Sequence, residues 1–183
     1  MDRFSEQLIE KTPDGKDKLK RALIIIGEIV LLALLALICF IIPTVLMVCV
    51  AVAMGSFFLF KLLMENTMYE YEYIVTNDDL DIDKIVGRRT RKRLITISLR
   101  SVKEMGQYGG NELKAEVTVI AHDGTGEDIW YLIADSEQYG SVALLFNPDR
   151  RTAANIVGGF EPKLRIEYTE KFGLKEDTEE TEE

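Results

Sequence analysis

A basic segment in the middle of the chain has the residue types of an anion-binding site. Five cationic side chains occupy the six positions after Gly87, namely Arg88, Arg89, Arg91, Lys92 and Arg93. Such density attracts nucleic acid or the anionic headgroups of membrane lipids. The alternative is a solvated hairpin tip that blocks aggregation between strands. Nucleic acid is not expected, because no aromatic ladder accompanies the arginines and the net charge is -9.

Residues that could carry catalysis are scarce, and we expect no enzymatic activity. The single histidine, His122, lies in a glycine-rich turn, and no nucleophile elbow or glycine-rich phosphate loop with a lysine is present. Cys39 and Cys49 lie in an apolar run with no second type of metal ligand nearby. An acidic string lacks the glycine and the closing glutamate of a calcium loop; it consists of Asp78, Asp79, Asp81 and Asp83. Neither a metal nor a cofactor is expected.

The elements that position the basic segment begin with an apolar run, residues 22–63, that has Pro43 near its midpoint. Each half, 22–42 and 45–63, is close to the roughly 20 residues that a bilayer-spanning helix needs. A helix cannot pass through Pro43 without losing a hydrogen bond. The sequence therefore predicts a helical hairpin that crosses a membrane twice. The apolar region of a cleaved signal peptide is shorter, at about 7–15 residues.

The basic residues predict how this hairpin is oriented. Lys16, Lys18, Lys20 and Arg21 precede the first helix, and Lys61 lies near the end of the second. The basic segment described above follows, whereas the turn at Pro43 carries no charge. Positively charged residues stay on the cytoplasmic side of a membrane. We therefore expect a multi-pass protein of the plasma membrane with both termini in the cytoplasm.

Three residues of the hairpin are candidates for helix packing. Glu28 lies inside the first helix, where an acid is a functional suspect. It also lies about two turns from the predicted start at residue 22, where the helix dipole favours a carboxylate. Ala51 and Gly55 form a small-xxx-small step, which allows close helix approach. We expect this step to pack against Ala33 and Ala36 of the first helix.

After residue 68 the pattern changes from helical to alternating, which predicts half-buried strands. Seven short antiparallel strands are predicted, at about 69–76, 80–86, 94–99, 101–108, 113–121, 129–133 and 139–146. Trp130 is expected in their core. A helix should follow, capped by Asn147 with Pro148 at its first position, and should end near Gly158.

The two ends of the chain carry weaker patterns. In the polar leader, residues 1–21, the spacing of Phe4, Leu8 and Ile9 predicts a short interfacial helix. After residue 159, alternation of Leu164, Ile166 and Tyr168 predicts an added strand. Acidic residues crowd the remainder, which predicts a disordered tail within residues 160–183.

Seven strands followed by one helix are similar to the pleckstrin-homology (PH-like) barrel, in which the final helix plugs one end. With the preceding hairpin, residues 22–159 resemble the bacterial membrane-anchored PH-like domain proteins. The residues that carry the resemblance are the hairpin and the segments YEYIVTNDDLDIDKIVGRRTRKR and FNPDRRTAANIV. It implies an α+β membrane protein, with a transmembrane helical hairpin, a PH-like antiparallel β-barrel over residues 68–159 and a capping helix.

These expectations combine into one function and one alternative. The first strand leaves the membrane helix and the second returns, so the basic turn should lie near the bilayer, where each Lys or Arg contributes about 1 kcal/mol of attraction. We expect a cytosolic PH-like domain that binds lipid headgroups or a protein at the inner membrane face. Alternatively, the chain is an accessory subunit of a membrane complex, with Glu28, Ala51 and Gly55 at a helix–helix interface. The partner and the oligomeric state stay open.

Overall fold

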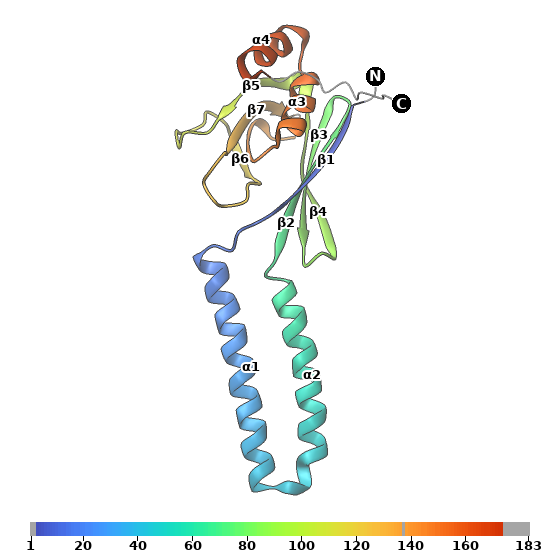
Figure 1. The fold of residues 1–183 in the computed structure, drawn as a ribbon, viewed down its shortest axis with the longest axis vertical. Helices are drawn as coiled ribbons and strands as arrows, with labels where there is room; N and C mark the ends of the chain where they lie inside the picture. The colour runs from blue at the N-terminus through green and yellow to red at the C-terminus, as the bar shows by residue number, and fades with distance from the viewer. Residues whose placement is uncertain (1–2, 137, 174–183) are drawn as a thin grey trace, which may run out of the picture. The chain divides into compact units, whose positions relative to one another are not determined.

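The computed structural model describes residues 3–136 and 138–173. Their elements fall into two compact units, which are treated separately below (Figure 1). The hairpin unit comprises Pro13–Tyr69 and Val86–Thr90. The β unit comprises the described residues of Met1–Thr12, Glu70–Ile85 and Arg91–Glu183. The chain therefore leaves the β unit for the hairpin unit twice, first for the two helices and then for the short segment Val86–Thr90.

Two long helices form the hairpin, as the apolar run predicts. Helix α1 (Gly15–Ile41) is followed by the short 3-10 helix η1 (Pro43–Val45) and by α2 (Leu46–Glu65). Helix α1 begins seven residues before the apolar run, because the carboxylate of Asp14 accepts a hydrogen bond from the Asp17 N–H at 2.8 Å and caps it. Both helices are long and apolar enough to cross a membrane.

The side chains of the hairpin are apolar on the outside as well as between the helices. Phe40, Met47 and Met54 leave 86%, 83% and 71% of their surface exposed. A core helix of a water-soluble protein would bury such residues against its neighbours. This exposure fits helices whose outer faces contact lipid.

The first sheet of the β unit begins at the N-terminus. Strand β1 (Phe4–Glu10) pairs antiparallel with β2 (Tyr69–Thr76), and β3 (Asp79–Val86) and β4 (Thr90–Ser98) complete the order β1-β2-β3-β4. The predicted interfacial helix at Phe4 is therefore wrong. Ser5 and its alternate neighbours face the core instead, and β1 pairs with β2, which follows the hairpin. The hairpin is thus an insertion between two paired strands.

The second sheet has the order β5-β7-β8-β6, and the short helix η2 (Leu99–Ser101) precedes it. Its strands are β5 (Val102–Gln107), β6 (Val117–Ile120), β7 (Trp130–Ser136) and β8 (Gly140–Phe146). Strand β6 runs parallel to β8, so the prediction of an entirely antiparallel domain is wrong here. Only four residues of the predicted strand 113–121 are extended in the sheet.

Two helices follow the sheets. Helix α3 (Arg150–Gly158) matches the predicted capping helix, but Asp149 caps it, since its carboxylate accepts the Thr152 N–H at 2.6 Å. Asn147 instead binds a loop, because its amide donates to the carbonyls of Glu127 and Asp128 at 2.8 and 3.1 Å.

The predicted strand after residue 159 is wrong, because α4 (Pro162–Phe172) forms there. Leu164, Tyr168 and Phe172 recur every fourth residue and pack on the core, whereas Ile166 is 61% exposed. The predicted acidic tail from residue 174 onward lies outside the described residues.

The core of the β unit lies among both sheets and these two helices. Its largest fully buried side chains include Tyr73, Leu80 and Phe146, and the rings of Tyr73 and Phe146 meet edge to face at 5.7 Å. Trp130 is half-buried against this core, with its ring 4.8 Å from that of Phe172. The predicted class, two long apolar N-terminal helices followed by antiparallel sheets and a capping helix, is confirmed.

Candidate functional site: the turn after strand β3

The tight turn that joins β3 to β4 contains the first residues of the basic segment. Gly87 and Arg88 adopt left-handed backbone conformations, with φ of +59° and +57°. Two successive residues of this kind form the type I′ turn that suits a two-stranded ribbon. Glycine adopts this conformation freely, whereas arginine needs the rest of the turn to hold it there.

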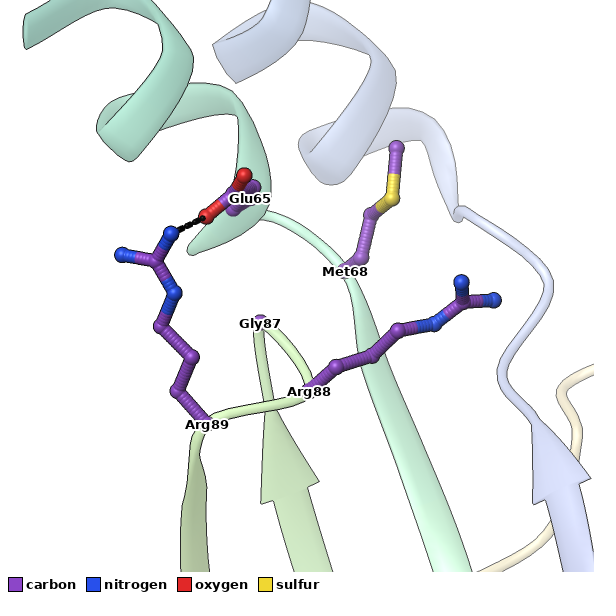
Figure 2. Close-up of a pocket in the computed structure, with 5 residues that line it drawn as sticks. All are labelled: Glu65, Met68, Gly87, Arg88 and Arg89. Carbon is purple, nitrogen blue, oxygen red and sulfur yellow. Dashed lines mark ion pairs between the residues drawn. The ribbon is translucent and has the colours of Figure 1, made fainter. Parts of the chain in front are cut away.

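This turn is bonded to the end of helix α2, within the hairpin unit. The Gly87 N–H donates to the Met68 carbonyl at 2.9 Å, and the Arg89 guanidinium lies 2.8 Å from the Glu65 carboxylate (Figure 2). A Cβ atom on Gly87 would lie only 3.2 Å from the Glu65 carbonyl oxygen, so the approach needs glycine. Strand parity predicts a turn beside the helix end, and the turn lies there.

Five residues line a shallow cleft of about 360 Å³ at this contact, namely Glu65, Met68, Gly87, Arg88 and Arg89. Figure 2 shows the side chains of Arg88 and Arg89 extending to opposite sides of the turn. Met68 is 50% exposed beside them. The cleft therefore combines two arginine side chains with the apolar side chain of Met68.

Further basic residues gather at the same end of the hairpin. The Arg21 Nε donates to the Thr67 Oγ1 at 2.9 Å, and the Tyr69 hydroxyl donates to the Asp17 carboxylate at 2.7 Å. These bonds tie the start of α1 to the residues that follow α2. We call the basic residues at this end the basic collar; they are Lys16, Lys18, Lys20, Arg21, Arg88 and Arg89.

The rest of the predicted basic patch does not belong to this collar. Arg91 and Arg93 lie in the β unit, where the guanidinium of Arg91 is 2.7 Å from the Glu72 carboxylate. Arg93 pairs with Asp81 at 2.5 Å and with Asp83. These two arginines neutralise acids of the sheet, whereas the prediction treated all five cations as one basic patch. Within the described part of the chain, Lys92 makes no ion pair.

The acids of this network are buried, which explains their arginine partners. The side chains of Glu72 and Asp83 are only 4% and 3% exposed. Burial raises the pKa of Glu72, a hydrogen bond with the Glu6 carboxyl raises it further, and the Arg91 charge opposes both. The hydrogen bond to Asp83 raises the pKa of Arg93. We assign this network a structural role, because both arginines are paired with carboxylates of the sheet.

The remaining titratable candidates are likewise engaged in local structure. Asp78 lies 2.5 Å from Arg100 and 3.1 Å from Arg3, and the Arg100 hydrogen bond lowers the pKa of Asp78. The Nδ1 of His122 accepts the Gly124 N–H at 3.0 Å, and burial lowers the pKa of His122. Over residues 3–136 and 138–173, no three acids, cysteines or histidines are grouped so as to hold a metal ion.

Of the three hairpin candidates, Glu28 lies between the helices, whereas Ala51 and Gly55 share an outer face of α2. Glu28 packs between the helices and accepts a hydrogen bond from the Ser56 hydroxyl at 2.9 Å. Ala51 is exposed, and a Cβ on Gly55 would meet nothing within 4 Å, so the predicted packing of this step against Ala33 is wrong. The phase of α2 turns Ala53 and Ser56 toward α1 and leaves the small-xxx-small step outside.

The explanation of Glu28 by the helix dipole also fails. Helix α1 begins at Gly15, so Glu28 lies 13 residues, or about 20 Å, from its N-terminus. The favourable effect of the dipole falls off within the first turn. Glu28 is thus an acid in an apolar span, and the Ser56 hydroxyl is its hydrogen-bond partner.

Sequence reasoning missed Glu65 and Met68 as members of the cleft. Glu65 is the last residue of α2, so the only available indication was an acid where the apolar run ends. Met68 reads as an ordinary linker residue before β2. Their role follows from the return of the chain at Gly87, which is a tertiary contact.

Together these features define a small β domain that carries an inserted helical hairpin of membrane-spanning length, with basic residues at one end of the hairpin. The chain belongs to the bacterial PH-like domain family DUF6106, whose family model matches residues 1–165. The predicted relationship to bacterial PH-like proteins is confirmed. No curated protein and no solved structure gives a significant match.

Proposed function

We propose that this chain is a non-enzymatic integral membrane protein that anchors its PH-like domain at the inner face of the bacterial membrane. In this proposal the basic collar contacts anionic lipid headgroups. The observation that carries it is the packing of the basic turn on the end of α2, through the 2.8 Å pair between Arg89 and Glu65. This contact supports the proposal because it puts cationic groups at the end of α2, where a membrane-spanning helix would leave the bilayer.

The charge balance of the hairpin unit supports a headgroup contact. The collar holds six basic residues against three acids at the same end, Asp14, Asp17 and Glu65, which leaves a net charge of +3. At about 1 kcal/mol for each net cation near an anionic surface, the attraction is about 3 kcal/mol. The whole chain has a net charge of -9, so the collar is a local reversal of sign.

The same charges support the orientation of the hairpin. Pro43 and Thr44, at the opposite end, have no charged neighbour between residues 29 and 60. Positively charged ends stay cytoplasmic and an uncharged turn crosses readily. The proposal therefore places the collar and the PH-like domain in the cytoplasm and η1 on the outside.

Topology is tested with single cysteines in a chain that lacks Cys39 and Cys49. Thr44 and Lys163 are exposed, so each serves as a labelling position. On intact cells, a membrane-impermeant thiol reagent should label Thr44→Cys and spare Lys163→Cys, which should react only after permeabilisation. Labelling of Lys163→Cys before permeabilisation would exclude the proposed orientation.

Headgroup contact is tested on the full chain in nanodiscs of mixed zwitterionic and anionic phospholipids. We expect more anionic lipid to be retained on detergent extraction than in the bulk mixture, measured by mass spectrometry. Arg88→Gln with Arg89→Gln should reduce this excess by at least half. The matched control is Arg151→Gln with Lys163→Gln, because these exposed residues lie in the β unit. An equal effect of both double variants would show that only net charge matters and would overturn the site.

A further inference from the structure

The apolar run contains one acid and one base, Glu28 and Lys61, and they are not paired with each other. Glu28 accepts a hydrogen bond from the Ser56 hydroxyl, which lies 3.0 Å from the Ala53 carbonyl as well. Lys61 is exposed and makes no ion pair with any described residue. Charged groups at membrane depth are costly unless they find a partner, so both side chains have unused binding capacity.

Glu28 opens onto a groove on the side of the hairpin. We call this the hairpin groove; it has a volume of about 410 Å³ and is lined by Glu28, Leu32, Val50, Ala53, Met54 and Phe57. On α2, Val50, Met54, Phe57 and Lys61 are spaced by four, three and four residues. This is the a/d spacing of helices that pack side by side in parallel. Lys61 therefore continues the groove-side face of α2.

The depth of Lys61 follows from the hydrogen bonds between the helix ends. Arg21 is bonded to Thr67, and Glu28 is bonded to Ser56. Lys61 lies between Ser56 and Thr67 on α2, so its depth falls between those of Glu28 and Arg21. Lys61 lies five residues, or about 7.5 Å along the helix axis, from Ser56, and a long, flexible lysine side chain can cover most of that rise.

We propose that a second copy of this chain packs against the hairpin groove, with Lys61 of each copy bound to Glu28 of the other. A two-fold axis along the membrane normal keeps every residue at its own depth, so the two ion pairs form together. A lipid acyl chain offers no hydrogen-bond donor to Glu28, whereas a second copy brings a cation whose flexible side chain can extend toward it. The inference rests on the proposed membrane insertion of the hairpin.

Disulfide crosslinking in native membranes tests the interface with the full chain. In a background without Cys39 and Cys49, Met54→Cys places a thiol in the groove, and Val52→Cys places one on a different face of α2. Both positions are exposed, which makes Val52 a matched control. Mild oxidation should give a covalent dimer with Met54→Cys, at least tenfold more than with Val52→Cys. Equal crosslinking at both positions would overturn the proposed interface.

Charge variants test the pairing itself. Glu28→Gln and Lys61→Gln should each raise the dissociation constant of the dimer about tenfold, the scale of one interhelical polar contact in a membrane. Glu28→Lys alone should abolish the Met54→Cys crosslink, and the swap Glu28→Lys with Lys61→Glu should restore it. Crosslinks that survive either Gln variant unchanged, or a swap without rescue, would contradict the pairing.

The same samples separate this inference from the proposed function. Resistance of each variant to carbonate extraction reports whether the hairpin is in the membrane. Extraction of the wild-type chain would overturn both the anchor and the dimer. Full retention with no crosslink at Met54→Cys, or a crosslink to a different protein, would overturn the dimer and leave the anchor standing.

Discussion

The β unit should fold without the hairpin, provided that both of its distant ends are kept. Glu10 and Glu70 are opposite each other in β1 and β2, so a two-residue Asn-Gly turn can replace the 59 residues between them. We expect this fusion, which contains residues 3–10 and 70–173, to be soluble and to unfold cooperatively. The fragment 69–159, the span that the strand pattern alone predicts as the domain, should not.

The difference in folding stability between the fusion and the fragment 69–159 follows from the elements that the fragment lacks. It has no α4, whose Tyr168 is 4% exposed, lies 5.8 Å from the Phe160 ring and accepts the Met105 N–H at 3.2 Å. Loss of one such buried aromatic costs about 3–5 kcal/mol. The fragment also lacks β1, which leaves the edge of β2 unpaired. Small domains are stable by only about 5–15 kcal/mol in total.

Near-ultraviolet circular dichroism and thermal unfolding measure the outcome for both proteins. We expect a sharp transition and a near-ultraviolet signal for the fusion, and a broad transition with little signal for the fragment. The same midpoint in both, within a few degrees, would refute the reasoning, because β1 and α4 would then contribute nothing to the core.

Three further predictions concern single residues. Tyr73→Phe should destabilise the β unit by about 1–3 kcal/mol in denaturant unfolding, because the buried hydroxyl donates to the Ala121 carbonyl and accepts the Asn147 N–H. A loss of stability below about 0.5 kcal/mol would contradict this. Gly87→Ala should lower the thermal unfolding midpoint more than Gly126→Ala does. Both glycines have positive φ, but of the two Gly87 is the one that lies against the α2 backbone. Equal decreases in the midpoint would contradict the contact between the turn and α2. Glu72 has a pKa raised above its usual 4.5 in the folded state, so its ionisation costs stability as pH rises through that raised value. The Glu72→Gln variant should therefore be more stable than wild type at pH 7, and this difference in stability should vanish below pH 4.5. A difference that grows as the pH falls would show that the pKa of Glu72 is lowered in the folded state.

Local patterns in the sequence were sufficient to predict several elements. Length, apolarity and Pro43 predicted the hairpin, because a helix satisfies its backbone within one segment. Strand β2 was predicted at its observed bounds, Tyr69–Thr76, since period-two alternation is also local. The end of α3 near Gly158 followed from its glycines. The basic turn was predicted beside the hairpin for the same reason, because strand lengths and turns determine where a short meander returns.

Tertiary structure alone decided the elements and charges whose partners lie far along the chain. Strand β1 exists because β2 pairs with it across the inserted hairpin, and Leu164 to Phe172 form a helix because that spacing covers the core. Packing also decided which acid each arginine neutralises: Arg89 pairs with Glu65 at the end of α2, whereas Arg91 pairs with the buried Glu72. An ion pair depends on which group lies within about 4 Å of the charge. That distance is a property of the folded chain, and no run of neighbouring residues contains it.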